Sequence, residues 1–212
     1  MSYLSLEPER SVLLTIDAQE DFSCPGAPAE IPGTWECLPA MGRLVDAYRV
    51  RGLPIVHVVR LYLADGSNAD LCRREAIEGG ARLVVPGSAG AELARPLRSS
   101  PTPPLDTDCL LSGTLQQLAP HEWAMYKPRW DAFFQTPLEA HLRALGVTTV
   151  IVTGCNFPNC PRATIYGASM RDFRIALITD AVSAIHGQGL AELRAIGVAT
   201  LACEEYLRTS AP

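Results

Sequence analysis

Short apolar runs recur along the chain, each bounded by polar or turn-forming residues. They span residues 11–16, 54–59, 122–126, 150–153, 174–179 and 198–202. Runs that are apolar at nearly every position are typical of strands buried on both faces of a parallel sheet. Apolar residues at helical spacing lie between several of these runs, at 41–49, 138–145, 163–170 and 190–196, and residues 71–77 suit a short charged helix.

This alternation of strands and helices predicts an α/β fold. We expect a three-layer α/β/α sandwich whose mostly parallel, doubly wound sheet has about six strands. Two segments rich in proline and glycine interrupt the pattern. We interpret residues 18–39 as a loop folded over the strand ends, too broken to form a helix, and residues 79–107 as a surface excursion. Residues 1–212 are therefore expected to form a single domain.

Composition narrows the possible functions. The chain has 48% hydrophobic and 19% charged residues and a formal charge of −5, which argues against nucleic acid or an anionic membrane as a partner. No apolar run is long enough to span a membrane, and the first residues lack a signal-peptide pattern. The seven cysteines form no CxxC pair and only four histidines are present, so we expect no metal site, no other cofactor and a reducing, cytoplasmic location.

Cys160 is the strongest candidate for a reactive residue. The run at 150–153 ends at Gly154, a loop follows, and Cys160-Pro161 opens a helical pattern. Proline suits the first turn of a helix, because its missing N–H would have no partner there. The positive end of a helix dipole favours a thiolate, so this position suits a nucleophile. The alternative is a buried cysteine that serves only in packing.

Asp17 and Lys127 also directly follow predicted strands. Ligands of doubly wound sheets bind beyond the carboxyl ends of the strands, so we expect Asp17, Lys127 and Cys160 to meet there. A carboxylate can accept the proton of a cysteine nucleophile, and a lysine can stabilise both charged groups. The backbone amides around Cys155 and Asn156 could form an oxyanion hole. Alternatively, Asp17 caps a turn and Lys127 is a solvated surface charge.

These residues carry a resemblance to a known family. The segment DAQEDF at 17–22 resembles the DxQxDF start of the isochorismatase-like cysteine hydrolases, which include nicotinamidases, N-carbamoylsarcosine amidases and biuret-type amidohydrolases. Lys127 with DAF at 131–133 and TPL at 136–138 resembles a second family segment, and TGCN…CPRAT at 153–164 resembles its nucleophile loop. Asp180-Ala181, which follows the next predicted strand, also resembles the family pattern. The similarity spans nearly the whole chain and is weakest between residues 64 and 120.

The resemblance implies a mechanism and a set of roles. It implies an Asp17–Lys127–Cys160 triad that forms a thioester with an amide-type carbonyl, releases ammonia or an amine, and is then hydrolysed by water. It also implies a non-proline cis peptide at Cys155–Asn156, a pocket wall that includes Phe22, and a homo-oligomer.

One family feature has no counterpart in this sequence. Nicotinamidases bind a divalent metal through a DxH…H cluster after the second strand, whereas this chain has HVVRLYLADGSNAD there. We interpret His57 as a core histidine, because a metal site needs clustered ligands. Nicotinamide is thus a poor candidate substrate. True isochorismatases, which cleave a vinyl ether, lack the nucleophilic cysteine, so Cys160 indicates cleavage of a C–N bond.

The sequence leaves the substrate open within one class: a small amide, ureide, carbamoyl compound or lactam. Phe22, Trp35 and Asn159 are the candidate substrate contacts, and Trp130, Phe134 and Phe157 are further possible pocket walls. Arg60, Arg129 and Arg162 could each bind a carboxylate, and the sequence does not select among them. Two rival functions remain: a catalytically idle binding or assembly subunit, and a redox-sensing thiol at Cys160 with Cys155 as its resolving partner.

Overall fold

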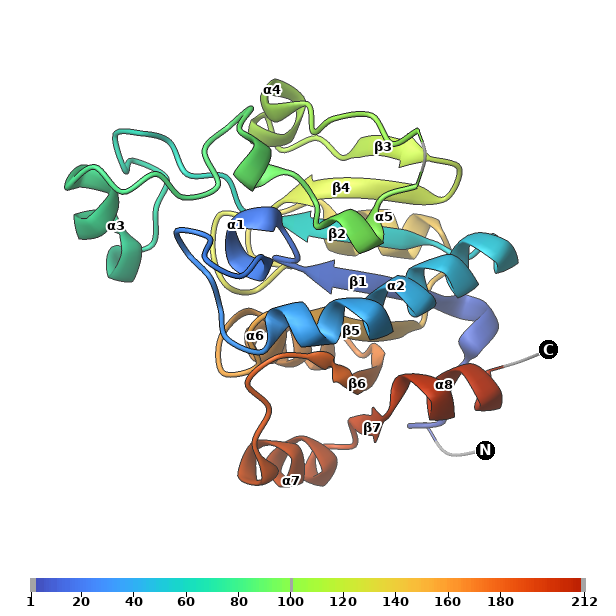
Figure 1. Cartoon of the computed structure of the whole chain (residues 1–212). Coiled ribbons are helices and arrows are strands. Elements are labelled where there is room, and N and C mark those ends of the chain that lie inside the picture. The colour runs from blue at the N-terminus through green and yellow to red at the C-terminus, as the bar shows by residue number, and fades with distance from the viewer. Residues whose placement is uncertain (1–2, 100, 211–212) are drawn as a thin grey trace.

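The computed structural model describes residues 3–99 and 101–210. Their strands form a sheet of order β3-β4-β2-β1-β5-β6-β7, parallel except for β3 (Figure 1). The strands are β1 (Ser11–Ile16), β2 (Ile55–Val59), β3 (Gln116–Ala119), β4 (Glu122–Tyr126), β5 (Thr149–Gly154), β6 (Arg174–Val182) and β7 (Ala199–Leu201). The six predicted strands are present, and β3 is a seventh that the apolar pattern missed.

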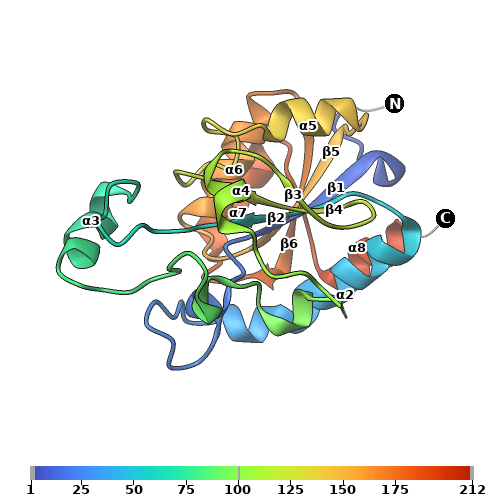
Figure 2. The same ribbon diagram turned by 90° about the horizontal axis from the view of Figure 1, so that it is seen from above.

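Helices cover both faces of the sheet, which confirms the three-layer prediction (Figure 2). Side chains of α5 (Leu138–Ala144), α6 (Cys160–Ser169) and α7 (Gly187–Ala195) pack with alternate residues of β1, such as Val12 and Leu14. On the other face, α2 (Thr34–Arg51) and α8 (Cys203–Thr209) pack against Leu13 and Ile151. Because successive strand residues point to opposite faces, a strand between two helical layers must be apolar throughout.

The segment 18–39 is more helical than the sequence suggested. It contains α1 (Glu20–Ser23), and α2 begins at Thr34 although Pro39 lies inside it. Proline removes a backbone donor from a helix. The apolar face of α2, which includes the buried Leu38, Met41 and Val45, supplies tertiary packing that outweighs this loss. The interpretation of 34–39 as loop was therefore wrong.

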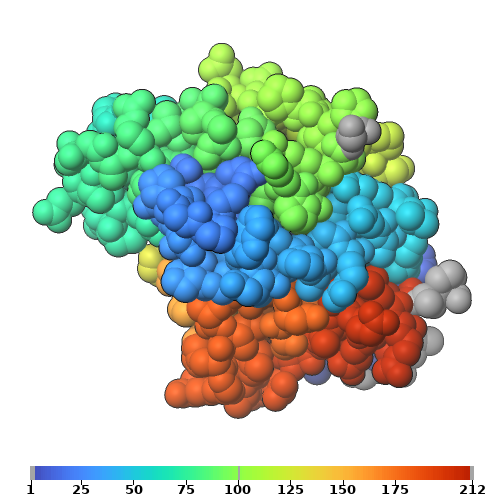
Figure 3. Space-filling model, in the orientation of Figure 1, coloured from blue at the N-terminus to red at the C-terminus, as the bar shows by residue number. Residues whose placement is uncertain are grey.

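The region between β2 and β3 contains short elements and much irregular chain. Its elements are α3 (Leu71–Glu78), the 3₁₀ turns Ala89–Ala91 and Arg95–Leu97, and α4 (Thr107–Leu111); a further 3₁₀ turn, Pro8–Arg10, precedes β1. The excursion returns to the N-terminal segment, where Gln19 pairs with Leu93 in an isolated bridge and the Ala94 N–H donates to the Ala18 carbonyl. Figure 3 shows the two segments side by side, blue and green. In Figures 1 and 2, α3 projects from the edge of the sheet where the parallel strands end.

Across residues 3–99 and 101–210, no helix has the length and apolar character needed to cross a bilayer.

Candidate active site

Asp17 and Lys127 form a buried ion pair at the carboxyl edge of the sheet. Lys127 Nζ lies 2.8 Å from Asp17 Oδ2, and the two residues are 0% and 3% exposed. The sheet positions both, because the Asp17 N–H donates to the Val58 carbonyl and the Lys127 N–H to the Val59 carbonyl. Within the described residues Asp17 Oδ1 has no hydrogen-bond partner. This oxygen is therefore available to accept a proton.

Cys160 is the first residue of α6 and lines the same small cavity as Asp17. Burial, with the nearby Asp17 carboxylate, raises the pKa of its thiol to about 11, while Lys127 and Arg60 act in the opposite direction. The sequence predicted a thiolate favoured by the helix dipole. The burial of this side chain, which is only 8% exposed, acts in the opposite direction, because removal from water disfavours the charged form.

The loop before Cys160 is fastened to β1. Its Cys155–Asn156 peptide bond is cis, as the resemblance implied. The Cys155 N–H donates to the Ile16 carbonyl, and its buried thiol donates to the Asp17 carbonyl at 3.1 Å. Gly154 has φ +117°, and a Cβ there would lie 2.1 Å from the Ile16 carbonyl oxygen. Only glycine allows β5 to approach β1 this closely, so Gly154 sets the path of the loop.

The cavity has a volume of about 60 Å³. Its lining residues come from five parts of the chain: Asp17, Phe22, Ile31, Arg60, Tyr62, Cys72, Arg73, Trp130, Cys155, Asn156, Asn159 and Cys160. The predicted contacts Phe22 and Asn159 are among them, as is Trp130. Drug-sized ligands occupy pockets of roughly 300–1,000 Å³, so this cavity suits a much smaller molecule.

Sequence reasoning missed the part of the wall that residues 62–73 supply. Tyr62 lies just beyond β2, and Cys72 and Arg73 lie at the start of α3. The helical pattern at 71–77 was visible, but a charged surface helix carries no signal of what it covers. Arg60, one of three arginines that the sequence could not separate, is the buried one of the three.

Arg60 is held in a fixed position behind the cavity. Its Nη1 donates to the Pro128 carbonyl at 2.8 Å, and its Nη2 lies 2.9 Å from the Asp70 carboxylate. Tyr62 donates its hydroxyl to the same carboxylate. Gln19 also contributes, because its side chain exchanges two hydrogen bonds with the Arg60 backbone. Nη1 and Nη2 of Arg60 thus have protein partners, whereas its buried Nε has none within the described residues, and Asp70 balances its charge.

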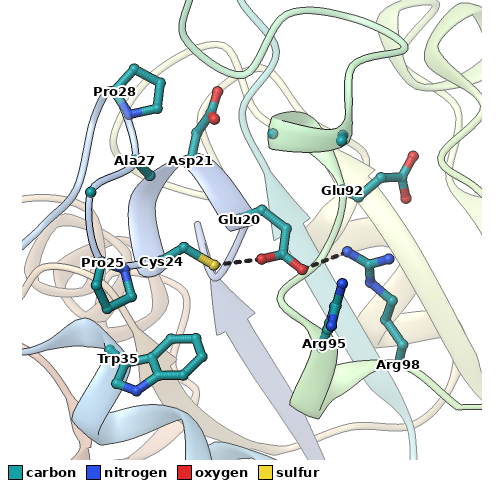
Figure 4. Close-up of a pocket in the computed structure, with 13 residues that line it drawn as sticks. Glu20, Asp21, Cys24, Pro25, Ala27, Pro28, Trp35, Glu92, Arg95 and Arg98 are labelled. Carbon is teal, nitrogen blue, oxygen red and sulfur yellow. Dashed lines mark hydrogen bonds and ion pairs between the residues drawn. The ribbon is translucent and has the colours of Figure 1, made fainter.

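Trp35 lies elsewhere, which corrects its assignment as a substrate contact. It is 48% exposed and lines a separate surface hollow of about 630 Å³ (Figure 4). Cys24, Glu20 and Arg98 lie on the walls of this hollow and are joined by the bonds drawn in Figure 4. Helix α1 separates the two spaces, since Glu20 faces the hollow and Phe22 the cavity. Phe134 is exposed and Phe157 is buried in the core, so neither lines the cavity.

The metal site of nicotinamidases does not fit this chain. His57 is buried in β2, where its Nδ1 lies 2.7 Å from Thr15 Oγ1 and its Nε2 lies 3.0 Å from Glu122 Oε1. Glu122 in turn receives two hydrogen bonds from Arg49. Both ring nitrogens of His57 are thus engaged within the core, which confirms its structural role. In the part of the chain that the structure describes, no three His, Cys, Asp or Glu side chains converge as metal ligands.

Comparison with known proteins supplies the family. The family description "Isochorismatase domain" matches residues 11–205. The chain is 31% identical to a probable inactive nicotinamidase of Arabidopsis thaliana over 92% of this chain and 94% of that protein. It is 27% identical to the ureidoacrylate amidohydrolase RutB of Methylobacterium radiotolerans, over 84% of this chain and 69% of that protein.

A solved structure agrees with this assignment. The isochorismatase family protein of Desulfovibrio vulgaris superposes with a TM-score of 0.80 at 31% identity, covering 94% of this chain and 97% of that one. The matched region, residues 11–205, contains β1, β4 and the loop after β5. All the residues of the cavity lie within it. The chain belongs to the isochorismatase family.

Proposed function

We propose that this protein is a cysteine hydrolase that cleaves a C–N bond of a small amide, ureide, carbamoyl compound or lactam. The observation that carries the proposal is the buried Asp17–Lys127 ion pair beside the thiol of Cys160, in a cavity at the carboxyl edge of the sheet. A buried charge pair is costly to maintain, and packing alone does not require one next to a cysteine. A relative that is named an amidohydrolase supports the same reaction class.

The raised pKa of Cys160 defines the first step. A neutral thiol must lose its proton as it attacks, and Asp17 Oδ1, which has no other partner, accepts that proton. The sulfur bonds to the substrate carbonyl carbon, and the carbonyl oxygen takes up the electron pair. Backbone N–H groups of the loop at 155–160 are the candidate donors to this oxyanion.

Collapse of the tetrahedral intermediate completes the first half of the reaction. The C–N bond breaks, and the leaving nitrogen takes the proton back from Asp17. A water molecule then attacks the carbonyl carbon of the thioester and gives a proton to Asp17; the C–S bond breaks, the Cys160 sulfur takes that proton back, and the carboxylic or carbamic acid is released. Throughout, Lys127 holds the Asp17 carboxylate in position and balances its charge.

Release of ammonia tests the proposal. Wild-type protein would be assayed on a panel of small primary amides, ureides and carbamoyl compounds, beside Cys160→Ser, Asp17→Asn and Cys109→Ser. Cys109 lies on α4, outside the cavity, and serves as the matched control. We expect Asp17→Asn to lower turnover by about 10²- to 10⁴-fold, the usual contribution of a general base, and Cys160→Ser to abolish it.

Two results would contradict the proposal. Turnover that survives in Cys160→Ser would exclude the thioester. Absence of turnover on the whole panel, together with reversible oxidation of Cys160, would favour the redox-sensing alternative. Absence of both would favour a binding subunit, a role that suits the name of the Arabidopsis relative.

A further inference from the structure

Arg73 is a cation on the wall of the cavity whose charge is not balanced. It is half-buried at the start of α3, and its guanidinium lies 5.9 Å from the centre of the Phe22 ring. Within residues 3–99 and 101–210, no carboxylate forms an ion pair with Arg73 and no acceptor takes a hydrogen bond from its side chain. Five guanidinium N–H donors are therefore available at this wall.

The other cations near the cavity are already paired. Lys127 is paired with Asp17, and Arg60 with Asp70. These pairs leave Arg73 as the excess positive charge of this group. A half-buried guanidinium beside an aromatic ring is poorly placed to be fully hydrated, and so it favours an anion that enters the cavity.

We propose that Arg73 binds a carboxylate of the substrate, so that this site selects small amides that are also acids. The inference rests on the proposed hydrolase function and specifies its substrate class. Arg73 and Cys160 line one cavity of about 60 Å³, so only a few atoms separate the carboxylate from the carbonyl that Cys160 attacks. A single unpaired guanidinium matches a singly charged carboxylate, with which it can form two parallel hydrogen bonds.

Arg74 provides a matched control on the same helix. It is the next residue and is also half-buried, but its Nη2 donates to the Ala69 carbonyl and it does not line the cavity. A general effect of removing positive charge from α3 would appear equally in Arg73→Met and Arg74→Met. Loss of a specific carboxylate contact would appear only in Arg73→Met.

Calorimetric titration of a Cys160→Ser background tests the proposal without turnover. The probes are three acid and neutral pairs: malonamate with malonamide, succinamate with succinamide, and N-carbamoylglycine with N-carbamoylglycinamide. We expect at least one acid to bind roughly 10- to 100-fold more tightly than its neutral partner, as one charge-assisted contact provides. Arg73→Met should remove this preference, Arg73→Lys should retain part of it, and Arg74→Met should leave it unchanged.

The proposal is overturned if no acid binds more tightly than its neutral partner, or if Arg73→Met and Arg74→Met lose the preference equally. Thermal melting of each variant shows whether α3 remains folded. The ammonia assay on the wild type keeps the two proposals separate. Equal kcat/KM for acids and neutral amides would leave the hydrolase function standing and refute the role of Arg73. A preference in binding without any turnover would support the anion site and refute the hydrolase.

Discussion

Replacing Lys127 with methionine tests the buried ion pair on which the account of the site depends. Methionine keeps most of the length of lysine but carries no charge, so the Asp17 carboxylate would remain buried without its partner. Both residues are almost completely enclosed, and their charged atoms are 2.8 Å apart. Removing one member of such a pair costs about 3–5 kcal/mol. For a protein of this size each kcal/mol lowers Tm by about 2–4 °C, so Tm should fall by about 6–20 °C.

The double variant Asp17→Asn/Lys127→Met distinguishes charge burial from loss of packing. With both charges removed, no carboxylate is left unpaired, and the double variant should be more stable than Lys127→Met alone. Glu9→Gln is the control, because Glu9 is exposed and pairs with Arg51 at the surface, where an ion pair contributes less than about 1 kcal/mol.

Urea denaturation and thermal melting followed by circular dichroism measure these differences. The reasoning is refuted if Lys127→Met loses no more stability than Glu9→Gln. It is also refuted if the double variant loses the sum of the two single effects, because independent side chains would then explain the data.

Three further predictions follow from the same structure. Because the Cys160 pKa is raised to about 11, the rate at which iodoacetamide alkylates Cys160 should rise about tenfold per pH unit from pH 7 to 10. Peptide mass spectrometry measures this rate, and a plateau at pH 9 or below would contradict the prediction. Burial raises the pKa of Glu122, but hydrogen bonds and charges of its arginine and histidine partners outweigh burial and lower it to about 2. The stabilisation of the fold by ionised Glu122 is therefore complete above the usual pKa of 4.5 and is lost as the pH falls toward 2. The urea midpoint of the wild type should fall over this pH range, and the midpoint of Glu122→Gln should lack this dependence. Gly154→Ala places a Cβ against the Ile16 carbonyl and should lower Tm strongly, whereas Gly187→Ala, with open space around it, should change stability by no more than about 0.5 kcal/mol.

The positions of Asp17, Lys127 and Cys160 could be predicted because a simple rule governs them. Asp17 and Lys127 directly follow apolar runs, Cys160 follows one after a short loop, and parallel strands bring their carboxyl ends to one edge of a sheet. The sequence could not predict how deeply Cys160 is buried. The start of helix α6 is visible in the sequence as a local pattern. The burial of the Cys160 thiol depends on residues that are distant in the sequence, such as Arg60 and Trp130, which line the same cavity.

The missed elements share a physical cause. Helix α2 begins at Thr34, before the point where Pro39 seemed to permit a helix, because tertiary packing overrides local propensity. Strand β3 has a single buried residue, Leu118, and pairs antiparallel at the edge, so it lacks the apolar run of the central strands. Arg73 reaches the cavity only through the path of the chain between β2 and α3, which carries no periodic signal.

Intact-protein mass spectrometry of the acid-quenched reaction tests the central claim most directly. During turnover of an amide, the wild type should gain the mass of the acyl group, peptide mapping should locate it on Cys160, and hydroxylamine at neutral pH should remove it, as expected of a thioester. Cys160→Ser should neither gain this mass nor release ammonia. An acyl group on another residue, or full turnover by Cys160→Ser, would contradict the account.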